Sequence, residues 1–153
     1  MPNLDDELYE KISEMSDLGN SFMDDGEYPR ALKIFEEALD LLPAPRNTWE
    51  AYTWLKAGIA DALFSVKDYE RATEELYDAM NGPDGASNPF ILLRLGQSLY
   101  ERGKSEGIDF LFKAYMLEGE EIFFRRGWEI PSSCKRSFGN QSKPTPLASV
   151  KRK

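Results

Sequence analysis

Residues 12–45 carry the spacing that most constrains what this chain can fold into. Small residues stand where two crossing helices would touch, and aromatic residues stand beside them to fill the space: Gly19, Ala31 and Ala38, with Phe22, Tyr28 and Phe35. Gly26 and Pro43 are placed to end the two helices. The pattern predicts a hairpin of two antiparallel helices, at residues 4–24 and 28–42.

The first of these helices has one apolar face. Its apolar residues recur at intervals of three and four: Leu4, Leu8, Ile12, Met15, Leu18 and Phe22. Such a stripe is typical of an amphipathic helix.

Two more stretches, at about residues 53–86 and 89–121, repeat the pattern. In the earlier one, Ala60 takes the small-residue position at the helix crossing. The connector before it is longer, and Asn47 or Thr48 is expected to cap the helix that follows.

The third hairpin is marked by its glycines. Gly96 and Gly103 are seven residues apart, as are Gly19 and Gly26. Asn88 is expected to cap its first helix. The second helix then places a small, a large and a small residue at the crossing: Gly107, Leu111 and Ala114.

With Leu18 before Gly19, residues 12–45 resemble a tetratricopeptide repeat, a helix-turn-helix unit of 34 residues. The resemblance implies an all-α, right-handed α-solenoid of three such hairpins, about six helices, over residues 1–124. Residues 125–153 are expected to form an irregular, basic C-terminal tail, partly capping or disordered. In that tail Phe124, Trp128 and Ile130 are expected to cover the open end of the third hairpin: a repeat array needs such a cap.

The charge is divided unequally along the chain. Residues 1–124 hold 26 acidic and 11 basic side chains, a net charge of −15, whereas residues 125–153 hold one acidic and eight basic side chains, a net charge of +7. An acidic body repels nucleic acid and membrane surfaces and favours a basic protein partner. Solubility alone explains the same charge equally well.

The composition argues against an enzyme. There is no histidine, which removes the commonest general base and metal ligand, and neither a glycine-rich phosphate loop nor a metal-ligand cluster occurs. Runs of acids on amphipathic helices are normally solvated faces, and Cys134 is expected to be an ordinary exposed thiol. We therefore expect no catalytic residues, no cofactor and no metal. The acidic start of the sequence and the lack of a long apolar run favour a cytoplasmic protein.

In the tetratricopeptide family the first helix of each hairpin lines a concave groove. Carried over to this sequence, the groove positions give these candidate partner-binding residues: Asn20, Trp54, Asp61, Phe64, Phe90, Leu93, Gln97, Tyr100 and Glu101. The alternative is that Trp54, Phe64 and Phe90 belong to the core. Binding of chaperone C-termini is not expected, because only Asn20 and Arg94 match the five groove positions of the carboxylate-binding members of the family. Ser16, Gly58 and Phe90 stand at the other three, where those members carry lysine or asparagine.

A second resemblance covers about residues 89–123, where LGQSLY at 95–100 is followed by KAYMLEGEEIF at 113–123. This stretch is similar to small bacterial tetratricopeptide proteins that neutralise polymorphic contact-dependent or Rhs-type toxins. The basic tail departs from their acidic, helical C-termini. The resemblance implies a non-enzymatic immunity protein that binds a toxin domain, and the alternative is a general adaptor in the assembly of a cellular complex.

Overall fold

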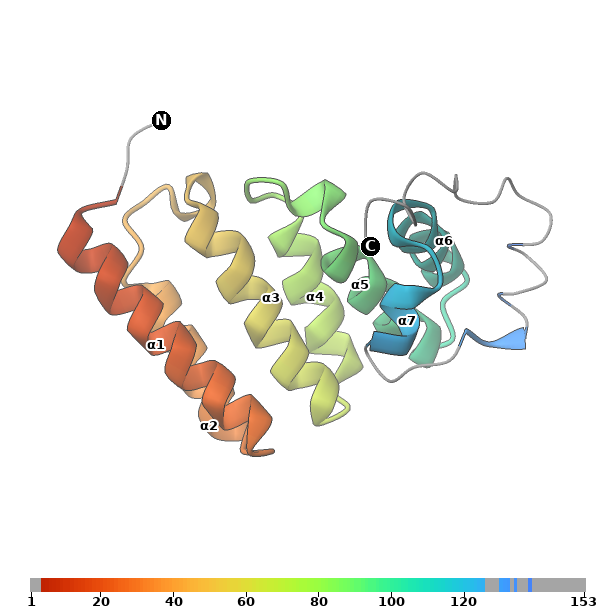
Figure 1. Ribbon diagram of the computed structural model, residues 1–153, viewed down its shortest axis with the longest axis horizontal. Helices are drawn as coiled ribbons and strands as arrows, with labels where there is room; N and C mark the ends of the chain where they lie inside the picture. Colours follow the sequence, from red (N-terminus) through yellow and green to blue (C-terminus); the bar gives the residue numbers. More distant parts are fainter. Residues whose placement is uncertain (1–3, 126–129, 133, 135–137, 139–153) are drawn as a thin grey trace. The chain divides into compact units, whose positions relative to one another are not determined.

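The computed structural model describes residues 4–125, 130–132, 134 and 138 of the chain. Every regular secondary-structure element within these residues is a helix (Figure 1). The helices are α1 (Asp6–Asp24), α2 (Tyr28–Asp40), α3 (Glu50–Ser65), α4 (Tyr69–Ala79), α5 (Pro89–Glu101), α6 (Glu106–Glu118) and α7 (Glu121–Arg125), with short 3₁₀ helices at Arg46–Thr48 and Gly85–Ser87.

Consecutive helices pack in pairs, α1 with α2, α3 with α4, and α5 with α6, so the prediction of an all-α fold built from helical hairpins is confirmed. The short helix α7 adds to the six that were expected. The chain divides into two compact units, Met1–Ser87 with α1 to α4 and Asn88–Lys153 with α5 to α7. We call them unit 1 and unit 2 and describe each by itself.

The ring of Phe35 holds unit 1 together. It projects from α2 and is only 1% exposed. A Cβ atom on Gly58 of α3 would lie 3.1 Å from this ring, and a Cβ atom on Gly19 of α1 would overlap it. Both glycines therefore let a neighbouring helix approach the ring closely, which is the role predicted for Gly19. Ala31 and Ala38, on either side of Phe35, are completely buried.

The apolar stripe predicted along α1 is unevenly buried. Ile12 is completely buried, but Leu18 is 45% exposed, and Leu8, Met15 and Phe22 are partly exposed. The buried line of α1 runs through Ile12 and Gly19. Leu18 lies about 100° around the helix from Gly19, beyond the edge of the contact with α2.

The turns are built as the sequence indicates in two of three hairpins. Gly26 and Gly103 adopt positive φ values of 75° and 74°, a conformation that glycine tolerates best. Lys67 takes the equivalent place in the second hairpin with a φ of 66°. Asn88 caps α5 as predicted, since its Oδ1 accepts hydrogen bonds from the backbone N–H groups of Phe90 and Ile91 at 2.9 and 3.2 Å.

The cap predicted for the second hairpin was wrong. Trp49 is the N-cap of α3, and it makes no side-chain capping bond. The 3₁₀ turn at Arg46–Thr48 redirects the two candidates: Asn47 Nδ2 donates to the carbonyl of Asn81, and Thr48 Oγ1 donates to the carbonyl of Pro45. Both side chains therefore stabilise the connector rather than the helix.

In unit 2, α5 and α6 cross at two glycines. A Cβ atom on Gly107 would lie 2.8 Å from the carbonyl oxygen of Gly96, so α6 rests directly on the backbone of α5. Leu111 and Ala114 are completely buried on the same side of α6. The register predicted for this helix is therefore the one observed.

The buried residues after α7 differ in part from those expected. Phe124 is 65% exposed, and Trp128 lies outside the described residues. Ile130 is buried, as expected, and Cys134 and Phe138 are buried as well, so Cys134 is not the exposed thiol that was expected. The Phe138 ring lies against α6, with ring centroids 5.3 Å from Phe112 and 5.1 Å from Tyr115.

Candidate protein-binding surface

Three of the predicted partner-binding residues share one face of α3. Trp54, Asp61 and Phe64 are spaced by seven and three residues, which places them on the same side of a helix. Trp54 and Phe64 pack against the core of unit 1 and are only partly buried. The Phe64 ring also meets Tyr69 edge-on, with centroids 5.3 Å apart. Each ring therefore packs against the core on one side and is exposed on the other. This is intermediate between the two alternatives predicted from sequence, a groove residue and a core residue.

The neighbouring helix α1 adds Asn20, which is exposed. α1 packs against α3, and Met23, three residues after Asn20, contacts the same core. Unit 1 therefore brings four of the nine predicted residues onto two adjacent helices. We call Asn20, Trp54, Asp61 and Phe64 the α1–α3 surface.

Sequence reasoning missed Tyr9, which is 54% exposed. It precedes Asn20 by eleven residues, about three helical turns, so the two side chains leave α1 on the same side. Tyr9 lies before the start of the repeat at residue 12, and for that reason it had no assigned groove position. A search for exposed aromatic residues in register with Asn20 would have found it.

The other five predicted residues lie on α5, in unit 2, and their burial differs. Phe90 and Tyr100 are partly buried and Glu101 is exposed, but Leu93 and Gln97 are completely buried. The last two cannot touch a partner unless the atoms that cover them move. The sequence already indicated this burial, because α5 is apolar on nearly all sides, as a buried helix is.

Gln97 has a structural role in unit 2. Its Oε1 accepts a hydrogen bond of 2.7 Å from the Arg94 guanidinium, which lies 5.5 Å from the centre of the Phe90 ring. The chain of contacts fixes Phe90 through Arg94. The Nε2 of Gln97 and the Oγ of Ser98 are buried without a hydrogen-bond partner.

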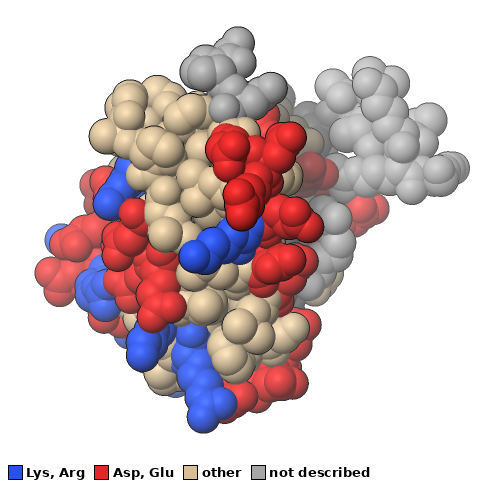
Figure 2. Space-filling model, turned by 90° about the vertical axis from the view of Figure 1, so that its left-hand side faces the viewer, with Lys and Arg blue, Asp and Glu red and all other residues tan. Residues whose placement is uncertain are grey.

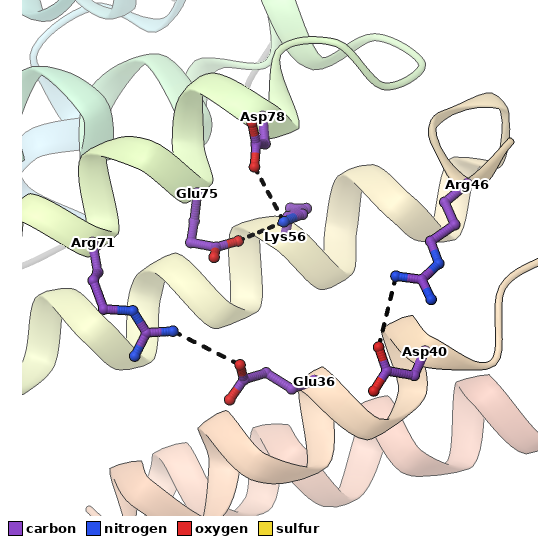
Figure 3. A network of polar contacts seen from close by, with 7 residues as sticks. All are labelled: Glu36, Asp40, Arg46, Lys56, Arg71, Glu75 and Asp78. Atoms are coloured by element: carbon purple, nitrogen blue, oxygen red, sulfur yellow. Dashed lines mark hydrogen bonds and ion pairs between the residues drawn. The ribbon is translucent and has the colours of Figure 1, made fainter. Parts of the chain in front are cut away.

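A network of ion pairs, not predicted from sequence, ties the helices of unit 1 together (Figure 3). Lys56 on α3 projects between two acids of α4, with its Nζ 2.7 Å from Glu75 and 3.3 Å from Asp78. Its side chain is only 13% exposed. Weaker, exposed pairs join Arg71 to Glu36 and Arg46 to Asp40, at 3.7 and 3.6 Å. The network holds α3 in place and with it the α1–α3 surface.

The pKa of Lys56 reflects two opposing effects. Burial, the largest single cause, lowers it, but the hydrogen bonds and charges of Glu75 and Asp78 together outweigh burial, so the pKa lies above its ordinary value. A raised pKa in the folded state means that the pair stabilises the fold fully below the unfolded pKa of about 10.4. The contribution is lost as the pH rises through the folded pKa.

We expect Lys56→Ala to lower the free energy of unfolding by about 1–3 kcal/mol at neutral pH, because it leaves two acids close together without their cation. Urea unfolding followed by circular dichroism measures this. The difference from the native protein should shrink as the pH rises past the ordinary lysine pKa of about 10.4. Lys33→Ala, at an exposed position on α2, is the control and should change stability by about 0.5 kcal/mol or less. An equal effect of both substitutions would contradict the role assigned to Lys56.

Other kinds of site find little support in the described ranges. No group of three or more histidine, cysteine or acidic residues there could hold a metal ion, and none of the helices described is both long and apolar enough to cross a bilayer. No protein-family model matches the sequence, and no curated protein matches it.

Proposed function

We propose that this chain is a protein-binding module that neutralises a toxin domain by direct contact through the α1–α3 surface. The observation that carries the proposal is the state of Trp54 and Phe64. Their inner sides pack on the core of unit 1, their outer sides remain accessible, and Asp61 lies between them on the same face. Aromatic side chains that are already held in place make strong anchors, because little conformational entropy is lost when a partner covers them.

Charge indicates the kind of partner. The 26 acidic and 11 basic side chains of residues 1–124 create a negative field that attracts a basic protein and speeds its encounter. A toxin that acts on nucleic acid, or that carries basic residues around its active centre, has this character. Occlusion of such a centre requires a complementary surface and no catalytic group.

The toxin in particular is suggested by the resemblance of residues 95–100 and 113–123 to immunity proteins. The alternative is an adaptor that holds two partners, and the division into two compact units favours it, because each unit could bind one partner. Mixing the purified chain with the toxin domain encoded beside it tests the proposal. We expect a one-to-one complex by size-exclusion chromatography. Absence of a complex, or two different partners bound at once, would favour the adaptor.

The association rate constant of that complex should report on charge attraction, and the dissociation rate constant should report on the aromatic contacts. Asp61→Asn removes a charge from the middle of the α1–α3 surface and hardly changes its shape. We expect the association rate constant to fall about two- to fivefold at low salt and to depend less on salt, with the dissociation rate constant nearly unchanged. Surface plasmon resonance at two salt concentrations measures both constants.

Glu74→Gln is the matched control, since it removes one exposed charge from α4. It should alter the association rate constant less than Asp61→Asn does. If the two substitutions have the same effect, the partner does not approach the α1–α3 surface.

A further inference from the structure

A second apolar surface lies on the outer edge of the first hairpin. Its residues are all partly or largely exposed, and we call them the outer stripe: Leu8, Met15, Leu18 and Phe22 from α1, Leu4 just before α1, Ile34 from α2 and Leu41 at its C-cap. Leu18 is 45% exposed, and neither Leu18 nor Ile34 packs against the core cluster of unit 1, whereas the inner sides of the other five rest on it. The stripe is therefore apolar surface that the packing of unit 1 leaves partly open.

The residues of the outer stripe are spaced like those of a helix that packs against another helix. Leu4, Leu8, Lys11, Met15, Leu18 and Phe22 follow intervals of four and three residues, the heptad spacing of a coiled-coil seam. The buried residues of α1 follow a different line, through Ile12 and Gly19. α1 therefore carries two apolar lines, and α2 and α3 fully cover only one of them.

The residues of α2 extend this surface across the hairpin. Ile34 and Leu41 are seven residues apart, so they leave the same side of α2. The guanidinium of Arg30 lies 5.9 Å from the centre of the Phe22 ring, which places this edge of α2 beside the stripe of α1. Two adjacent helix edges form a surface on which a third helix can pack.

The charges beside the outer stripe discriminate between possible occupants. Glu7, Glu10, Glu14 and Asp17 of α1 are all exposed, and only Lys11 opposes them on that helix. On α2 the exposed bases Arg30 and Lys33 are outnumbered by the exposed acids Glu36, Glu37 and Asp40, so the hairpin as a whole is acidic. In Figure 2, which looks onto the first hairpin, uncharged surface lies among acidic side chains, with basic side chains also beside it. A second copy of this chain would bring two such acidic helices together, which like charges disfavour, whereas a helix with basic edges would be attracted.

We propose that the outer stripe is a docking surface for an amphipathic helix of a partner protein, with large apolar side chains on one face and Lys or Arg along its edges. The apolar face covers Leu18, Met15 and Ile34, and the basic edges meet the acids of α1. The surface is separate from the α1–α3 surface, so the proposal does not depend on the proposed neutralisation of a toxin.

A synthetic helical peptide tests it: three heptads with Leu at the two seam positions and Lys at the flanking positions, where mutual repulsion limits self-association. The native full chain should bind this peptide more than about tenfold more tightly than a peptide with Glu in place of each Lys. Leu18→Glu should weaken binding about tenfold or more, because it puts a charge in the seam. Leu117→Glu is the matched control, since Leu117 on α6 is 47% exposed, and it should leave binding unchanged.

Two results would overturn the proposal. One is equal binding of the Lys and Glu peptides, or an equal effect of the Leu18 and Leu117 substitutions, which would mean that the contact is unspecific. The other comes from sedimentation of the free protein: a dimer that Leu18→Glu dissociates would show that a second copy occupies the outer stripe. Circular dichroism of each variant establishes that the helices remain intact.

Discussion

Replacing Phe35 by Ala should lower the free energy of unfolding by about 3–5 kcal/mol, the largest effect on stability that we expect from any single substitution in unit 1. The ring is 1% exposed and fills the space that Gly19 and Gly58 leave between α1, α2 and α3. The two facing residues are glycines, which have no side chain that could move into that space. Urea unfolding followed by circular dichroism measures the loss.

A paired substitution checks the same contact from the other side. Gly19→Ala alone should destabilise the fold by about 1–3 kcal/mol, because its Cβ atom would overlap the ring. In the Phe35→Ala background that Cβ atom enters an empty space. The two effects should therefore sum to more than the loss in the double variant. Simple additivity would contradict the close contact.

Replacing Trp54 by Ala should weaken binding of the toxin domain that we propose as partner by about 2–4 kcal/mol, or roughly 30- to 1,000-fold in Kd. The indole is the largest side chain of the α1–α3 surface, and the core of unit 1 already holds its inner edge. Most of the loss should appear as faster dissociation, because removal of an uncharged ring hardly alters the encounter of the two proteins.

Tyr77→Ala is the control for this substitution. Tyr77 lies on α4 and is 43% exposed, so its loss removes a comparable exposed ring from a helix outside the proposed surface. It should leave Kd within about twofold of the native value. If Tyr77→Ala and Trp54→Ala weaken binding equally, the anchor does not lie on α3.

The fold could be predicted to the extent that single residues dictate backbone geometry. Gly19 and Phe35 identify a crossing of helices because only glycine admits a ring at that distance, and the structure has this contact. Asn88 before Pro89 likewise identifies the start of a helix, which the two capping hydrogen bonds confirm. Signals of this kind are local and do not depend on where the rest of the chain lies.

The degree of burial could not be predicted in the same way, because it depends on what lies opposite. The apolar spacing that includes Leu18 is the same whether that side of the helix is buried or exposed to solvent. In the structure Leu18 is exposed. Leu93 and Gln97 were assigned to a surface by repeat position, yet both are completely buried. Lys56 was overlooked because its acidic partners, Glu75 and Asp78, are about twenty residues further along the chain.

The most direct test of the account is growth of cells that produce the toxin domain that we propose as partner, sought among the products of the neighbouring genes. Co-production of the native chain should restore growth, and Trp54→Ala, produced to the same level and equally helical, should not. Failure of the native chain to restore growth, or equal rescue by the Trp54→Ala variant, would contradict neutralisation through the α1–α3 surface.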